Sequence, residues 1–230
     1  MKFFQNNLKE IVYGGSDGIV TTFAVVSGFA GAGGVDVGTH GFFLVILFGF
    51  ANLFGDATSM GLGDFLSSLS QRDVSLKAKK NIDDDLENNI KKLVIETEKL
   101  LVSEGMSEND AKVQMTIFER NHELWKNYLM KSKYDISREM KENPAISSLA
   151  TFSSFIIFGL IPLLPFVFMK GELSQLFGFS LGAAGVALLL LGVLRWRVTG
   201  SNLIRSALEA LFIGGTASGV AYLVGVYLGK

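Results

Sequence analysis

Four residues whose side chains can bind a metal ion recur at a regular spacing of four within one apolar stretch of the sequence. They are Asn52, Asp56, Met60 and Asp64, and they lie within residues 42–69. Each residue turns a helix by about 100°, so positions four apart drift by only about 40° and share one face. Carboxylate and amide oxygens are hard metal ligands and a thioether sulfur is a soft one, so together they suit a cation of intermediate softness. We therefore interpret Asn52, Asp56 and Met60 as a candidate cation site.

This candidate site would lie inside a membrane helix. Residues 42–69 exceed the length of about 20 apolar residues that a transmembrane helix requires. A carboxylate in such a helix costs roughly 3 kcal/mol or more unless it is paired, hydrated or bound to a cation. The cost favours a functional role for Asp56, such as lining a path for cations across the membrane.

A second intramembrane acid, Asp17, lies in the preceding apolar stretch, after Gly14, Gly15 and Ser16. One interpretation is a helix cap at the membrane surface, where the side chain of Ser16 or Asp17 accepts hydrogen bonds from free backbone amides. The other interpretation places Asp17 beside residues 42–69 as a further cation ligand. The residues alone leave both open.

Five apolar segments predict an all-α membrane protein. They cover about residues 11–34, 42–69, 145–169, 173–194 and 203–228. The chain of 230 residues is 49% hydrophobic, with a mean hydropathy of +0.37, and most of its charge falls between residues 71 and 142. We predict transmembrane helices 1 and 2 in residues 1–69, a cytoplasmic helical-hairpin insert in residues 70–143, and transmembrane helices 3–5 in residues 144–230.

The insert has the apolar periodicity of two amphipathic helices. The first would carry Leu86, Ile90, Leu93, Val94, Leu100 and Leu101, and the second Ala111, Met115, Phe118, His122, Trp125 and Leu129. Gly105 and Ser107 between them are typical of a helix end and a helix start. Acidic and basic residues alternate along the insert, so a solvated helix face is the simplest interpretation of any single acid.

The basic residues predict the orientation in the membrane. Nineteen of the 21 Lys and Arg residues precede the first segment, lie in the insert or flank the fourth-to-fifth connection, whereas only Lys170 and Lys230 fall on the other side. The positive-inside rule then places the N-terminus and the insert in the cytosol and the C-terminus outside. Because no targeting extension is recognisable, we expect an integral protein of a prokaryotic plasma membrane.

Several chemistries have no signature in the sequence. It contains no phosphate loop, nucleophile–base pair, HExxH motif or nucleic-acid motif, and it has no cysteine for a thiolate site. We expect a protein that is not an enzyme, binds no nucleic acid and holds no tightly bound cofactor.

Runs throughout the chain resemble the vacuolar iron transporter family. They are Asp17-Gly-Ile-Val-Thr-Thr-Phe-Ala-Val-Val-Ser-Gly, Ala51-Asn-Leu-Phe-Gly-Asp-Ala-Thr-Ser-Met-Gly-Leu-Gly-Asp-Phe-Leu-Ser, Ser70-Gln-Arg-Asp, Asn143-Pro144, Gly159-Leu-Ile-Pro-Leu-Leu-Pro and Ala221-Tyr-Leu-Val-Gly. The resemblance implies a homodimer in the lipid bilayer that moves Fe²⁺, and in some members Mn²⁺, out of the cytosol in exchange for protons.

The resemblance also implies roles for residues in the first two membrane segments. The family's first-segment aspartate falls on Asp17 and its second-segment methionine falls on Met60. A family glutamate falls on Asn52, which is a departure, and Asp56 one turn later on the same face could supply the missing charge.

In the insert, the family's metal-binding acids are matched only in part. Acids are retained at Asp85 and Glu96 and a methionine at Met130, whereas Lys133 stands where the family has another ligand. Since an ammonium group repels a divalent cation at close range, we predict a metal site at Asp85, Glu96 and Met130 that is either weakened or repositioned. In the repositioned site, acids such as Glu87, Glu119 or Glu123 would substitute for the missing ligands.

Two functions of other classes remain as alternatives to transport. One is a membrane-anchored module that binds or stores metal through its insert. The other is a structural assembly protein whose intramembrane polar residues only hold helices together.

Overall fold

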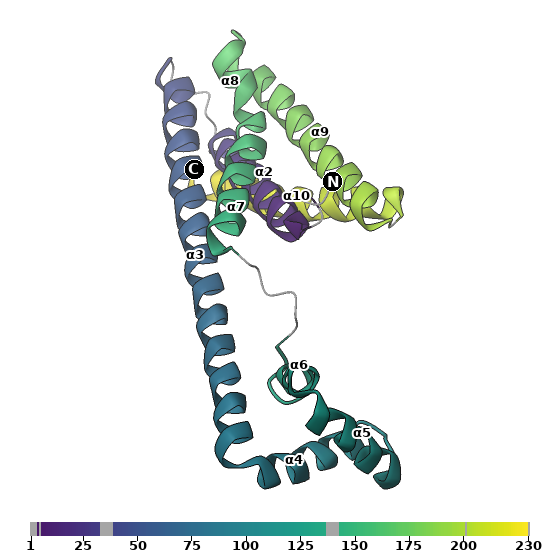
Figure 1. Cartoon of the computed structure of the whole chain (residues 1–230). Helices are drawn as coiled ribbons and strands as arrows, with labels where there is room; N and C mark the ends of the chain where they lie inside the picture. Colours follow the sequence, from purple (N-terminus) through teal and green to yellow (C-terminus); the bar gives the residue numbers. More distant parts are fainter. Residues whose placement is uncertain (1–3, 5, 33–38, 137–142, 201, 230) are drawn as a thin grey trace. The chain divides into compact units, whose positions relative to one another are not determined.

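The computed structural model describes residues 4, 6–32, 39–136, 143–200 and 202–229, and in these residues the secondary structure is helical with no strand (Figure 1). The chain forms two compact units. We call Met1–Phe65 with Asn143–Lys230 the membrane unit, and Leu66–Glu142 the insert unit. The end of the first predicted segment, after residue 32, lies outside the described residues.

The membrane unit contains most of the apolar helices. They are α2 (Leu8–Gly31), the first part of α3 (Thr39–Asn88), α7 (Pro144–Gly159), a 3₁₀ turn η1 (Ile161–Leu163), α8 (Leu164–Phe168), α9 (Leu173–Thr199) and α10 (Leu203–Leu228). Within the described residues, four segments are long and apolar enough to cross a membrane: Gly41–Asn88, Pro144–Phe168, Leu173–Thr199 and Ile204–Leu228. Helix α2 is not among them, because its glycines, hydroxyl residues and Asp17 lower its hydropathy.

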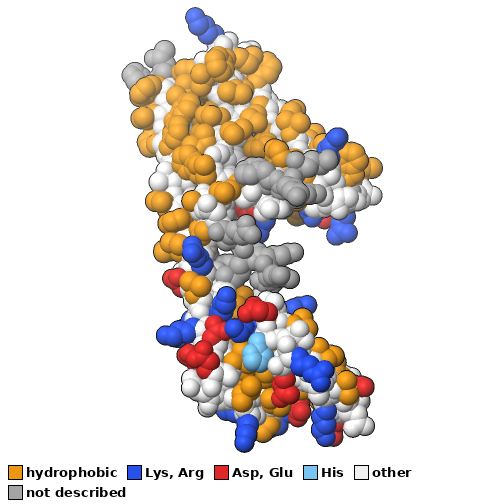
Figure 2. All heavy atoms as spheres, viewed as in Figure 1, with side chains coloured by type: hydrophobic (Ala, Val, Ile, Leu, Met, Phe, Trp, Pro, Cys, Tyr) orange, Lys and Arg blue, Asp and Glu red, His pale blue; other side chains and the backbone are white. Residues whose placement is uncertain are grey.

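Helix α2 nevertheless packs against α7, α9 and α10. Glycines permit the close approach of these helices, as small residues do in membranes. A Cβ atom on Gly18 would collide with the backbone carbonyl of Phe155, and one on Gly14 would lie 2.7 Å from the carbonyl oxygen of Thr151. The buried core around α2 includes Ile19, Phe23, Val26, Leu53, Phe155 and Leu191. Many apolar side chains remain exposed on the outside of this unit (Figure 2), as a lipid-facing surface requires.

The two prolines of the third predicted segment interrupt its helix, as expected. Helix α7 begins at Pro144, with the Asn143 side chain accepting a 3.0 Å hydrogen bond from the Ala145 amide, and it ends at Gly159. Residues around Pro162 form the 3₁₀ turn because proline cannot donate the helical hydrogen bond. The Pro162 carbonyl accepts a 2.7 Å hydrogen bond from Ser180 on α9.

Helix α3 continues beyond the second apolar segment as one helix of 50 residues. Residues 70–88 contain no glycine or proline, and a change from apolar to polar composition does not by itself end a helix.

The insert unit contains the end of α3, α4 (Ile90–Ser103), α5 (Glu108–Arg120) and α6 (His122–Ser132). The predicted second helix is broken at Asn121, so α5 and α6 replace the single helix of a hairpin. The Ser107 start is confirmed, because its hydroxyl accepts a hydrogen bond from the Asp110 amide. Trp125 is fully buried in the core of this unit, and its indole N–H donates a 2.9 Å hydrogen bond to the Thr97 hydroxyl.

Candidate functional site

The regular face predicted on residues 42–69 is present on α3. Asn52, Asp56, Met60 and Asp64 are each half-buried, whereas Phe54, Leu62 and Leu66 are exposed. The Asn52 side-chain amide donates a 2.9 Å hydrogen bond to the Asp56 carboxylate one turn later. This bond links two of the predicted ligands on one face of α3.

Asp64, the last member of this face, has a partner on another helix. Its carboxylate accepts a 2.5 Å hydrogen bond from the Ser147 hydroxyl on α7. Gly61 on α3 also approaches Phe152 on α7. Asp64 therefore fixes the position of α3 against α7.

Asp17 lies well inside α2, which begins at Leu8, so the capping interpretation of Asp17 is wrong. Its side chain is half-buried, and its charge lies close enough to that of Asp56 for the two to repel each other. The charge of Asp56 on α3 thus acts on Asp17 on α2, 39 positions earlier in the sequence.

A cavity of about 600 Å³ adjoins Asp17. Its lining includes Lys9, Tyr13 and Ser16 on α2 and Arg195 on α9. Arg195 also donates a 2.8 Å ion-pair hydrogen bond to Glu209 on α10. Leu8, Val12, Val20 and Ile213 also line this cavity, so charged and hydroxyl groups lie within a mainly apolar wall.

Met60 is half-buried and packs against the apolar core that contains Leu53 and Ala57. Within the part of the chain that the structure describes, no group of three or more His, Asp or Glu side chains is arranged to hold a metal ion. The described residues of one copy thus supply Asp17 on α2, and Asp56 with one amide and one thioether on α3. These are fewer ligands than a closed metal site contains.

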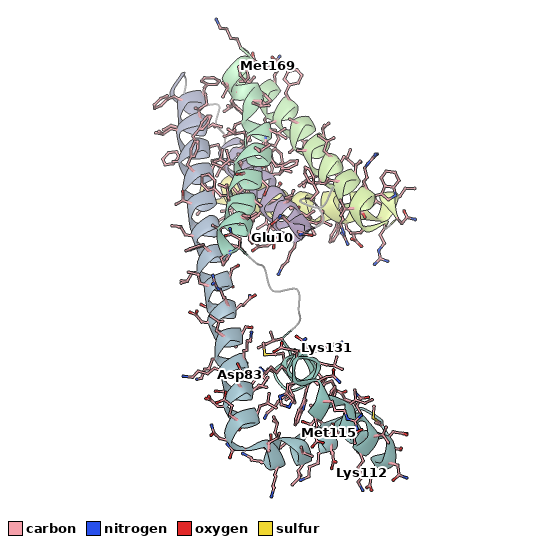
Figure 3. All side chains as sticks on the ribbon, in the orientation of Figure 1. Glu10, Asp83, Lys112, Met115, Lys131 and Met169 are labelled. Carbon is pink, nitrogen blue, oxygen red and sulfur yellow. The ribbon has the colours of Figure 1, made fainter. Side chains whose placement is uncertain are left out.

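Sequence reasoning missed one buried acid. Glu10 is only 4% exposed near the start of α2 (Figure 3), and its backbone carbonyl accepts a hydrogen bond from Ser154 on α7. The signal was its spacing of seven residues from Asp17, which places both on one face of a helix.

In the insert unit, a lysine engages one of the predicted metal ligands. The Lys133 ammonium lies 2.9 Å from the Glu96 carboxylate, and Lys92 lies 3.7 Å away. The hydrogen bond from Lys133, with the charges of both lysines, holds the pKa of Glu96 below its usual value of 4.5. The charge of Asp85 also acts on Lys133, while Asp85 itself accepts a 3.4 Å hydrogen bond from Asn89. Met130 packs at the edge of the insert core.

Comparison with known proteins agrees with the resemblance seen in the sequence. A family model described as the VIT family matches residues 8–226. The chain belongs to the VIT family. A protein of Plasmodium falciparum named vacuolar iron transporter is 30% identical over 97% of this chain and 83% of its own length. Vacuolar iron transporter 1 of Oryza sativa subsp. japonica is 27% identical over 94% of this chain and 82% of its own length.

Membership of the VIT family places the chain among transporters rather than enzymes. With its candidate spans, the chain is a membrane protein. These relatives come from plants and apicomplexan parasites and are named for the vacuole, so they do not support the expected prokaryotic plasma membrane.

Proposed function

We propose that this protein is a secondary transporter that moves Fe²⁺ and Mn²⁺ out of the cytosol in exchange for protons. The observation that carries the proposal is the pair Asp17 and Asp56, two acids from different helices whose charges interact inside an apolar unit. Such a pair is unfavourable without a cation or a proton between the carboxylates. Its relatives are named iron transporters, which supports the choice of metal.

The proposed ligand set is shared between two copies of the chain. A homodimer with a two-fold axis beside α2 and α3 would double each ligand, so that Asp17, Asp56 and Met60 of both subunits surround one path. Fe²⁺ is intermediate in softness, so carboxylate, amide and thioether ligands would hold it without the tight binding of a thiolate cluster. Because Asn52 stands where the family has a glutamate, Asp56 is the acid that supplies the negative charge on α3.

Proton exchange follows from competition for the same carboxylates. Two neighbouring acids away from bulk water favour a shared proton. Metal binding expels this proton, and metal release allows it to return, so that the two fluxes are coupled.

In the proposed topology α2 is a fifth span. Residues 1–69 and 144–230 form the membrane helices, and residues 70–143 form a cytoplasmic insert. The glycines of α2 fit closely against α7, and its polar residues line the path, which explains why its hydropathy is lower. The excess of Lys and Arg supports a cytoplasmic N-terminus and insert, with the C-terminus on the opposite side.

The test is Fe²⁺ and Mn²⁺ flux into proteoliposomes with and without an imposed pH gradient. We expect the imposed pH gradient to accelerate metal transport, and we expect protons to move in the direction opposite to the metal. Asp56→Asn should lower the rate at least about tenfold and Met60→Leu should shift metal preference away from Fe²⁺. Glu172→Gln is the matched control, because Glu172 is exposed just before α9. Flux that ignores the pH gradient would leave a passive path and remove exchange.

The same variants separate transport from the two alternatives. For a structural assembly protein, Asp56→Asn and Met60→Leu keep the shape and should keep the function. For a metal-storage module, binding would survive both substitutions because it would depend on the insert. The pairing of Glu96 with Lys133 weighs against storage.

A further inference from the structure

A second cavity, of about 280 Å³, lies between α2, α9 and α10 in the membrane unit. Its walls are mainly apolar and include Phe23, Phe177, Leu181, Leu188 and Leu211. Among the described residues its lining contains no charged side chain and no residue of α3. This cavity borders the one beside Asp17 at Val20, but it includes none of the four residues Asn52, Asp56, Met60 and Asp64.

Two buried hydroxyl groups distinguish this cavity from a simple packing defect. Ser27 on α2 and Ser218 on α10 line it and are 1% and 7% exposed. In the described structure neither hydroxyl has a hydrogen-bond partner. Serine in a helix usually donates to the carbonyl of the preceding turn, as Ser154 does to Ala150 here. A buried polar group without a partner is unfavourable, so these two hydroxyls indicate a partner supplied from outside the chain.

The hydroxyls lie toward the aromatic end of the cavity. The rings of Phe23 and Phe177 stack at 5.8 Å, and those of Phe177 and Tyr222 at 6.4 Å. Ser27 is one helical turn from Phe23, and Ser218 is one turn from Tyr222. Leu188 lies at the other end of the cavity. It follows Phe177 in the sequence of α9, and at about 1.5 Å per residue the two are about 16 Å apart along the helix. The cavity thus has a polar, aromatic end and a purely apolar end.

The cavity is reached from the lipid-facing surface. Leu181 and Tyr222 line it and are also 53% and 42% exposed. In a bilayer these side chains meet lipid, so an occupant enters from the membrane. Its volume lies just below the range of about 300–1,000 Å³ of small-molecule sites, which suits one chain rather than a whole phospholipid.

The geometry points to a binding site for a neutral amphipathic lipid with a single chain. A hydroxyl or ester oxygen of the lipid bonds to Ser27 and Ser218, and its hydrocarbon chain extends toward Leu188 and Leu211. The lipid is neutral because no charged side chain among the described lining residues would pair with a charged group. It would hold α2 against α9 and α10, but the binding itself does not depend on the proposed transport.

Photolabelling of the full-length protein in phosphatidylcholine vesicles tests the site. The probe is a monoacylglycerol with a diazirine in its chain, and labelled peptides are mapped by mass spectrometry. Labelling should concentrate on the cavity lining, and unlabelled mono-olein should compete for it far better than hexadecane, which lacks the oxygen atoms.

Glycine positions provide matched variants. Gly215 and Gly219 line the cavity and have open space where a Cβ would be, so Gly215→Leu and Gly219→Leu fill it without a backbone clash. Each should lower labelling at least about tenfold while the protein keeps its melting temperature. Gly182→Leu on α9 also has open space but does not line the cavity, and it should change nothing.

The hydroxyls are tested by the double variant Ser27→Ala with Ser218→Ala, with Ser174→Ala on the exposed surface as its control. The double variant should lose the preference for mono-olein over hexadecane. Three results would each overturn the proposal. The first is equal labelling of wild type and both glycine variants, and the second is label spread evenly over the outer faces of α9 and α10. The third is an unchanged preference for mono-olein after loss of both hydroxyls.

Discussion

At the residue scale, Lys133 determines what the acids of the insert can bind. Its ammonium group forms the ion pair with Glu96, so a divalent cation at Glu96 would have to displace it. Lys133→Met removes this competitor and offers a thioether in its place. We expect the affinity of the purified protein for Mn²⁺ or Co²⁺ to rise at least about tenfold, measured by calorimetry on the full chain.

The matched control is Lys131→Met, since Lys131 is exposed on α6 (Figure 3) and its ammonium group is not paired with Glu96. If both variants bind metal no better than wild type, Asp85, Glu96 and Met130 do not form a latent metal site.

The same ion pair predicts a pH dependence of insert stability. Because the pKa of Glu96 lies below 4.5, its contribution is present above pH 4.5 and is lost as the pH falls through its value in the folded protein. Burial alone lowers the pKa of Lys133, but the hydrogen bond and charge of Glu96 more than offset this, so its pKa lies above 10.5. Its contribution is present below pH 10.5 and is lost as the pH rises through the folded-state pKa.

The measurement is the melting temperature of wild type minus that of Lys133→Met. It should be positive near neutral pH and fall toward zero in acid below pH 4.5. Trp125 fluorescence in a Trp196→Phe background reports the insert, since Trp125 is fully buried in that unit. A difference that stays constant into acid would show that Lys133 acts through packing and not through charge.

At the element scale, the α2–α7 contact depends on glycine. A Cβ at Gly18 would collide with the Phe155 backbone, which cannot rotate away as a side chain can. Gly18→Ala should therefore destabilise the membrane unit by about 1–3 kcal/mol or more and displace the neighbouring Asp17. Size-exclusion profiles after heating should show a lower melting temperature, and metal flux should be reduced.

Gly63→Ala is the control, because Gly63 on α3 is exposed and a Cβ added there would meet no described atom within 4 Å. Equal melting temperatures for the two variants would show that α2 and α7 can separate at little cost, and the glycine argument would fail.

Local patterns predicted the helices better than their partners. The bounds predicted for the last segment, 203–228, match α10, because Asn202 caps its start and the apolar run fixes its length. The first predicted insert helix, which includes Leu86, is divided at Asn89, because α3 continues to Asn88 and α4 begins at Ile90. The partner of Asp64 is Ser147, 83 positions away, and the partner of Glu96 is Lys133, 37 positions away. Such pairings depend on tertiary packing, which no periodicity encodes.

At the scale of the whole molecule, one copy of the described chain supplies too few ligands for a metal path. Asp17 and Asp56 interact, yet the described residues contain no group of three His, Asp or Glu side chains arranged to hold a metal ion. If two copies share one path, a single defective subunit should inactivate the pair; if each copy transports alone, it should not.

Co-expression with a defective chain decides between these cases. Wild type and an Asp17→Asn, Asp56→Asn double variant carry different tags and are reconstituted at equal amounts. A shared path predicts that about one quarter of the homodimer activity remains, because only pairs of two wild-type chains function, whereas independent paths predict about one half. Purification through both tags isolates mixed dimers, which should be inactive. Mixed dimers with half the wild-type rate would place a complete path within each chain, and the ligands beyond Asp17, Asp56 and Met60 would then have to come from the same copy.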